Sequence, residues 1–189
     1  MRYEKGHKEA TRGRILEEAS RRFREEGIAA VGVANLMSGI GLTQGGFYNH
    51  FESKDDLARE ALVISSGATI RRLGEAGQLQ AIVNWYLSPA HRDNPGKGCP
   101  AATLAPEVAR GSDNLRHSFT ESLQETLAVL RSCLPGKLTP ARKRATAMAM
   151  FASMVGTMSL ARAVDDPAVS SELLAAGRRA VMALLPEAP

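Results

Sequence analysis

The stretch VANLMSGIGLTQGGFYNHFESKDDL, residues 33–57, decides the fold prediction for this chain. Apolar residues with helical spacing predict a helix from about residue 33 to residue 40, which ends at Gly41. A second, short helix begins after Thr43, and Ser53 caps the start of a third. Two short helices joined by a glycine turn are typical of proteins that place the second helix in the major groove of DNA.

Two glycines inside the short helix support this prediction. Gly45 and Gly46 each cost about 1 kcal/mol relative to alanine in a helix, so local stability does not explain them. Residues without Cβ atoms let a backbone approach a DNA groove closely, whereas the alternative explanation is a loose turn. Thr43 can cap the helix and bind a phosphate, and Gln44 carries a donor and an acceptor suited to a base edge, best to adenine.

Polar side chains continue to the end of the short helix. Tyr48, Asn49 and His50 carry donors suited to phosphate oxygens, whereas Phe47 is expected in the core. Lys54 is a cation in the first turn of the third helix, which the helix dipole disfavours unless a phosphate binds at the same helix end. The predicted DNA face consists of Thr43, Gln44, Gly45, Gly46, Tyr48, Asn49, His50 and Lys54.

The composition is that of a globular protein. The chain has 189 residues, of which 44% are hydrophobic and 23% charged, and its formal net charge is +4 at pH 7. Residues 1–60 contain ten basic and ten acidic residues, and the basic ones outnumber the acidic ones at the N-terminal end. This basic segment is predicted to be an arm that contacts DNA phosphates, with a solvated tail as the alternative. Two cysteines and no signal peptide predict a cytoplasmic location. Nothing indicates a membrane helix, a cofactor or a metal site.

Helical spacing recurs along the chain, and no run shows the alternation of a strand. We therefore expect an all-α fold of about nine helices. The first helix is predicted over residues 8–26, where Glu17 and Glu18 stand four residues before Arg21 and Arg22 and can form ion pairs with them. The later helices are expected over residues 53–74, 78–88, 99–110, 113–133, 139–165 and 167–185, with a loop at residues 88–98.

A known family shares these motifs. The run GLTQGGFYNHFESKDDL, residues 41–57, resembles the recognition segment of the TetR family of one-component repressors, which is close to G-V-S-x-G-x-L-Y-x-H-F-x-S-K-x-x-L. The upstream pattern R-x-x-I-L-x-x-A…F…G also fits, from Arg12 to Gly27, so the resemblance covers about residues 10–60. Gly32 departs from the family, which usually has Ser or Thr there. The matching positions are Gly41, Gly45, Tyr48, His50, Phe51, Ser53, Lys54 and Leu57.

The resemblance implies a domain organisation and a function. It implies a helix-turn-helix DNA-binding domain over residues 1–55 and an effector-binding and dimerisation domain over residues 56–189. Such a protein is not an enzyme: it binds a palindromic operator as a homodimer and is released by a small-molecule effector.

Beyond residue 60 the resemblance is weak. The helix 139–165 is apolar all round, which predicts one face against a second subunit and the other, with Met150 and Met154, toward the core or a ligand cavity. We expect this helix and the helix 167–185 to form a four-helix dimer interface, with burial inside one monomer as the alternative. The interface stripes are Ala145, Met148, Ala149, Ala152, Val155, Gly156, Ser159, Leu160 and Ala163 in the first helix, and Leu173, Leu174, Gly177, Val181 and Leu184 in the second.

An effector site needs an apolar cavity with a few polar groups. Seven residues are candidates for its lining, and for each of them ordinary core packing is the alternative. They are Trp85, Tyr86, Cys99, His117, Phe119, Met150 and Met154.

Cys99 suggests a different signal. It lies beside Lys97 at a predicted helix start, where a thiol pKa is lowered, and some TetR-like regulators use a similar cysteine to sense electrophiles. A small buried cysteine without a redox role is the alternative. A cysteine-dependent hydrolase using Cys99 with His91 or His117 is a further class, which lacks an orienting carboxylate at a recognisable spacing. An adaptor whose helical head binds another protein would leave the glycines unexplained.

Overall fold

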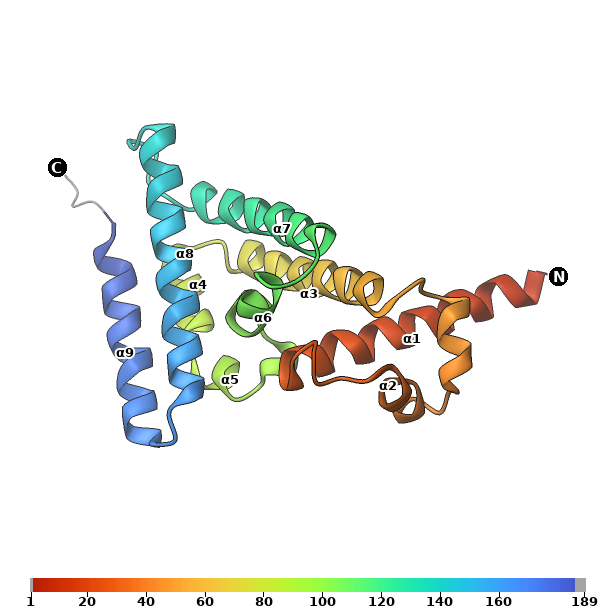
Figure 1. Ribbon diagram of the computed structural model, residues 1–189. Helices are drawn as coiled ribbons and strands as arrows, with labels where there is room; N and C mark the ends of the chain where they lie inside the picture. Colours follow the sequence, from red (N-terminus) through yellow and green to blue (C-terminus); the bar gives the residue numbers. More distant parts are fainter. Residues whose placement is uncertain (1, 186–189) are drawn as a thin grey trace.

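The computed structural model describes residues 2–185, and it describes side chains from residue 6 onward. These residues form nine α-helices and two 3₁₀ helices without a strand, which confirms the prediction of an all-α fold (Figure 1). The elements are α1 (Arg2–Glu26), α2 (Val33–Gly39), η1 (Gln44–Asn49), α3 (Lys54–Ala76), α4 (Leu79–Tyr86), α5 (Pro89–Arg92), η2 (Pro95–Lys97), α6 (Ala101–Val108), α7 (Asp113–Ser132), α8 (Pro140–Ala163) and α9 (Pro167–Ala183).

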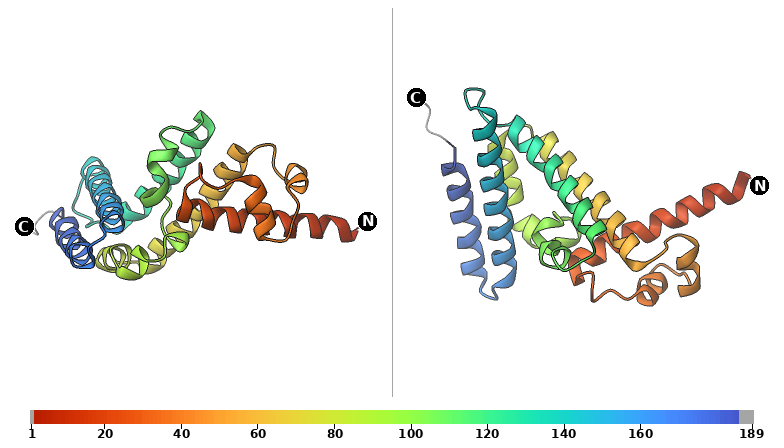
Figure 2. Two further views of the ribbon diagram at one scale, coloured as in Figure 1. Left: turned by 60° about the horizontal axis from the view of Figure 1, so that its bottom comes forward. Right: turned by 45° about the horizontal axis from the view of Figure 1, so that its top comes forward.

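The molecule is elongated, with different helices at its two ends. Helices α1 and α2 and the 3₁₀ helix η1 form one end, and α8 and α9 lie side by side at the other (Figures 1 and 2). Helix α3 starts at the first end, packs along α7, and reaches the C-terminal half of the molecule. A single helix therefore runs from one end of the fold toward the other.

The first hydrophobic core holds α1, α2, η1 and α3 together. Phe47 of η1 is fully buried in it, and so is Ile15 of α1. Side chains from farther along the chain complete this core, because Leu104 and Val108 of α6 and Leu115 of α7 belong to the same cluster. The first core is thus not built from the N-terminal residues alone.

The second core lies among α4, α7, α8 and α9. Tyr86, Met150 and Met154 are fully buried there, and Leu73 brings the end of α3 into the same cluster. The prediction that one face of α8 points inward is confirmed by these methionines. Helix α3 contributes to both cores, since Leu57 at its start belongs to the first.

Two local predictions were wrong. Helix α1 begins at Arg2 rather than near residue 8, so the N-terminal basic residues belong to a helix and not to a separate arm. The side chains of Arg2 and Lys5 are outside the part of the chain whose side chains the structure describes. The expected loop at residues 88–98 contains α5 and η2. Helix α5 forms because Ser88 Oγ accepts the His91 N–H at 3.1 Å and a proline follows the cap.

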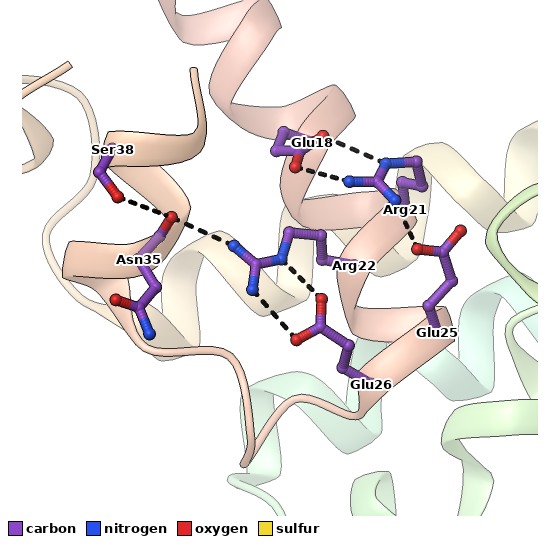
Figure 3. A network of polar contacts seen from close by, with 7 residues as sticks. All are labelled: Glu18, Arg21, Arg22, Glu25, Glu26, Asn35 and Ser38. Atoms are coloured by element: carbon purple, nitrogen blue, oxygen red, sulfur yellow. Dashed lines mark hydrogen bonds and ion pairs between the residues drawn. The ribbon is translucent and has the colours of Figure 1, made fainter. Parts of the chain in front are cut away.

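The predicted ion pairs of α1 are replaced by others (Figure 3). Arg21 pairs with Glu18 at 2.7 Å and with Glu25 at 2.5 Å, and Arg22 pairs with Glu26. Exposed pairs of this kind contribute about 0.2–1 kcal/mol each. Arg22 also donates to the Asn35 carbonyl at 3.1 Å, which ties α1 to α2.

Helices α8 and α9 pack closely at one glycine. A Cβ atom on Gly177 would come within 2.7 Å of the Thr157 hydroxyl oxygen, so any larger residue would force Thr157 to shift. Leu174 and Val181 are buried on the same side of α9. The stripe predicted on α9 therefore packs largely inside the protomer, and this part of the dimer prediction was wrong.

Candidate DNA-binding surface and ligand pocket

The 3₁₀ helix η1 is anchored by one aromatic side chain and otherwise faces solvent. The ring of Phe47 stacks on Phe51, with 5.6 Å between the ring centroids. Tyr48 meets the same ring edge-on at 5.2 Å, yet 66% of its surface is exposed. A fixed backbone with exposed neighbouring side chains is the geometry that groove binding needs.

Most of the predicted DNA face is accessible. Gln44, Gly45 and Asn49 are exposed, and a Cβ atom on Gly45 would meet nothing within 4 Å. Thr43 stands at the N-cap position, but its side chain makes no cap hydrogen bond, so the predicted capping role was wrong. Gly46 is partly covered by Met37 and by Thr43 itself.

His50 closes this surface near the N-terminal half of α1. Its Nδ1 atom is buried without a hydrogen-bond partner among the described residues. Burial lowers the pKa of His50, and the positive charges of Lys8 and Arg12 lower it further, so the ring is neutral at pH 7. The motif at residues 41–57 does not indicate that these two α1 cations lie near His50, because their proximity depends on how α1 crosses η1.

Arg12 holds this corner together. Its guanidinium pairs with Glu60 at 2.5 Å and lies over the Phe51 ring, 4.6 Å from the ring centroid. Its Nε also donates to the His50 carbonyl at 3.4 Å. Arg12 therefore fixes the orientation of η1 relative to α1 and α3.

Lys54 lies at the start of α3, as predicted, and the Ser53 cap is confirmed. Ser53 Oγ accepts the Asp56 N–H at 3.1 Å. The Lys54 ammonium donates to the Ala29 carbonyl at 3.3 Å, in the turn between α1 and α2. The cation that the helix dipole disfavours thus has a carbonyl partner in the protein itself.

The same turn is contacted by α6. Glu107 accepts the Ala29 N–H at 2.8 Å, and a Cβ atom on Gly27, whose φ is +92°, would come within 2.7 Å of the same carboxylate. Nearby, Arg24 of α1 donates to the Gly96 carbonyl of η2. These long-range contacts could not be predicted from the sequence, because no motif marks either partner of each pair.

A narrow pocket with a cavity volume of about 10 Å³ lies between α3, α6, α7 and α8. It contains two of the predicted ligand-site residues, Cys99 and Phe119. Sequence reasoning missed its hydroxyl groups, although their spacing on the inward faces of α3 and α7 was a usable signal. The pocket is lined by Ser66, Thr69, Cys99, Pro100, Ala101, Phe119, Ser122, Leu123, Thr126 and Phe151.

The other ligand-site candidates lie outside this lining. Tyr86, Met150 and Met154 are core residues behind it, and burial raises the pKa of Tyr86 well above its ordinary value. Trp85 stacks on His91 with 5.1 Å between the rings. His117 is on the surface, with 73% of its side chain exposed, and it lies 3.4 Å from a Glu121 oxygen.

Cys99 does not have the environment predicted for a reactive thiolate. Only 3% of the residue is exposed, and burial raises the pKa of its thiol. His91 is not placed as a base for it either, because His91 Nε2 accepts the Cys99 backbone N–H at 3.0 Å and Nδ1 lies 2.6 Å from the Tyr86 carbonyl. The structure thus contradicts the low thiol pKa, and His91 lacks the position that a hydrolase would need.

The described side chains include no group of three or more metal-ligating residues. No helix within residues 2–185 is both long and apolar enough to cross a membrane.

Comparisons with known proteins agree with this geometry. Residues 15–61 match the family model "Bacterial regulatory proteins, tetR family". The HTH-type transcriptional repressor KstR2 of Mycobacterium tuberculosis is 37% identical over 57 residues, which make up 30% of this chain and only 28% of KstR2.

Solved structures show the same fold over nearly the whole chain. A TetR family transcriptional regulator from Cytophaga hutchinsonii has a TM-score of 0.77 at 20% identity, covering 96% of this chain and 98% of its own. FadR from Bacillus subtilis, in complex with stearoyl-CoA, has a TM-score of 0.66 at 17% identity, covering 93% and 98%. Residues 15–61 therefore match the DNA-binding domain of the TetR family, and the described residues have the fold of solved TetR family regulators.

Proposed function

We propose that the protein is a transcriptional repressor that binds a palindromic DNA operator as a homodimer and leaves it when a small molecule binds. The observation that carries this proposal is the exposed 3₁₀ helix η1, which Phe47 fixes to the core while Gly45 faces open space. The name of KstR2, a repressor, supports the direction of regulation. In this proposal residues 1–55 read DNA, and residues 56–189 bind the effector and the second subunit.

The exposed side chains of η1 have distinct roles in this proposal. Gln44 reads a base edge, because its amide can donate and accept at once. Thr43, Tyr48 and Asn49 bind phosphates and fix the orientation of η1 on the duplex. Lys54 exchanges the Ala29 carbonyl for a phosphate at the start of α3, where the helix dipole favours an anion.

The dimer interface is proposed on the outer faces of α8 and α9. Four of the large apolar side chains that are exposed in the protomer lie on this helix pair, which forms the end of the molecule far from η1. Between them stand exposed small residues of α8, among them Ala152 and Gly156, so a second helix pair can approach closely. The four large side chains are Met148, Leu160, Val169 and Leu184.

The effector is proposed to widen and occupy the narrow pocket between α3, α6, α7 and α8, and to act through α6. Thr69 and Thr126 already donate their hydroxyl protons to helix carbonyls at 3.2 and 2.9 Å, which leaves their oxygens free to accept. The N-terminal end of α6 lines the pocket. Near the other end of α6, Glu107 accepts a hydrogen bond from the turn before α2. The stearoyl-CoA bound to FadR supports a ligand-responsive role for this fold.

DNA selection tests the central claim. The protein is incubated with a random duplex library, and the recovered sequence is used in anisotropy titrations at several salt concentrations. We expect an inverted repeat and an affinity that falls steeply with salt. Gln44→Ala should relax the preference at one base in each half-site, and Lys54→Ala should weaken all sequences alike. Failure to enrich any sequence would refute the proposal.

The dimer is tested separately. Leu160→Arg places a charge in the proposed interface, and we expect a monomer in sedimentation velocity. Val63→Arg is the matched control, because Val63 is another exposed apolar residue that lies on α3. If Leu160→Arg stays dimeric, the interface lies elsewhere.

A further inference from the structure

A second concave site lies between the end of α7 and the start of α8. It is a groove with a volume of about 370 Å³, and it shares no lining residue with the narrow pocket described above. The turn that joins the two helices lies at the end of the molecule away from η1 (Figure 1). A ligand in this groove therefore does not compete with DNA for η1. The groove is lined by Ala128, Arg131, Ser132, Leu138, Pro140 and Lys143.

The chain around this groove is strongly basic. Residues 126–164 contain six basic residues and no acidic one. Five of the six belong to the segment 131–144, which we call the α7–α8 tip. None of these five forms an ion pair with any residue whose side chain the structure describes. The five are Arg131, Lys137, Arg142, Lys143 and Arg144.

Two carboxylates on neighbouring elements offset only part of this charge. Glu125 stands on α7, three residues before Ala128 of the groove. Glu75 stands near the end of α3, two residues before Gly77, whose carbonyl accepts a hydrogen bond from the Cys133 thiol. Both glutamates are exposed, and the groove lining itself contains no carboxylate. Within the described residues, the five cations of the α7–α8 tip therefore exceed these carboxylates by three charges.

Arg131 and Lys143 line the groove from its two helices. The Nε atom of Arg131 is buried and has no hydrogen-bond partner in the part of the chain that the structure describes. Lys143 lies near the start of α8, where the helix dipole disfavours a cation. An anion between these two side chains would supply the missing acceptor and offset the repulsion. Two cations match a dianion, and a phosphate group carries about −1.5 to −2 charges at pH 7.

We propose that this groove binds a small organic phosphate, at a site additional to the proposed effector pocket. The phosphate lies between Arg131 and Lys143, and the body of the ligand lies on the apolar surface of Ala128, Leu138 and Pro140. The volume of about 370 Å³ is in the range of small-molecule sites. The proposed dimer uses the outer faces of α8 and α9, whereas the groove lies between α7 and α8, so both can form in one protein.

The probe for this site is phenyl phosphate. Benzoate and phenol have the same ring with a smaller charge or none, and inorganic phosphate has the charge without the ring. Binding is measured without DNA, at constant ionic strength, from the amide NMR shifts of Ala128, Ser132, Leu138 and Lys143. We expect phenyl phosphate to shift these amides, benzoate and inorganic phosphate to bind about tenfold more weakly, and phenol not to bind.

Two variants test the cations. Lys143→Glu reverses one charge and should weaken phenyl phosphate binding about tenfold, and Arg131→Gln removes the other and should weaken it about fivefold. Lys97→Glu is the matched control, because Lys97 is an exposed lysine of η2, outside the groove, and its replacement changes the net charge equally. If Arg131→Gln melts well below the parent protein, the decision rests on Lys143→Glu, whose side chain belongs to neither core.

Three results would overturn the proposal. The first is the absence of phenyl phosphate binding, and the second is an equal loss of binding in Lys143→Glu and Lys97→Glu, which would show attraction by net charge alone. The third is displacement of phenyl phosphate from the groove by a DNA duplex of random sequence, which would make the α7–α8 tip a nucleic-acid contact instead. The first two leave the proposed operator binding by η1 untouched, and a failure of operator selection would likewise leave the groove and its ligand class unchanged.

Discussion

Replacing Gly45 by alanine separates the stability of η1 from its proposed contact with DNA. In the free protein the added methyl group enters open space, and Gly45 is not among the glycines with positive φ. Alanine in place of an unstrained glycine stabilises a fold by about 0.4–1 kcal/mol, so the free energy of unfolding should stay level or rise.

In the complex the same methyl group stands between the backbone and the groove. If it costs each subunit one hydrogen bond to a phosphate, at about 1.5 kcal/mol, a dimer loses about 3 kcal/mol. This corresponds to roughly a hundredfold weaker operator binding.

The assay pairs urea unfolding with anisotropy titration on the selected operator at one salt concentration. Gly136→Ala is the control, because it also adds a methyl group in open space but lies in the turn before α8. Operator affinity within twofold of the parent, with stability intact, would show that the backbone at Gly45 does not approach DNA closely.

Three further predictions concern contacts away from η1. Glu107→Ala should lower the free energy of unfolding by about 1 kcal/mol in urea titrations, because the Ala29 N–H loses its acceptor. Gly177→Ala should cost about 1–3 kcal/mol by overpacking against Thr157, and adding Thr157→Ala should recover part of the loss. Burial lowers the pKa of His91 from 6.5 to about 4, so its unfolded form binds a proton first as the pH falls. Stability should therefore drop between pH 6.5 and about 4, by up to about 3 kcal/mol, and His91→Ala should lack this component when both proteins are compared in urea.

Local signals predicted the N-terminal elements well. The Ser53 cap and the turn at Gly41 lie where residues 33–57 predicted them, and the structure places Phe47 in the core and Gln44 in solvent as the pattern required. The type of η1 was less predictable. Its two adjacent glycines weaken an α-helix, and the short segment adopts the tighter 3₁₀ form, whose hydrogen bonds join residues three apart.

The packing of residues against distant parts of the chain could not be predicted from the sequence. The stripe from Leu174 to Val181 has the same spacing whether it faces a second subunit or α8, and only the close fit of Gly177 on Thr157 decides between the two. Likewise, Cys99 beside a cation at a helix start predicts a lowered thiol pKa, but packing buries the sulfur and reverses the shift.

The first core contains side chains from α6 and α7, and this limits how the DNA-binding segment could be exchanged between related proteins. Leu104, Val108 and Leu115 seal the hydrophobic cluster around Phe47, so a chimera cut near residue 55 would expose that cluster unless the recipient supplied equivalent side chains. Exchange of DNA specificity between relatives should therefore succeed more often by grafting the surface of η1 than by transplanting the whole N-terminal segment.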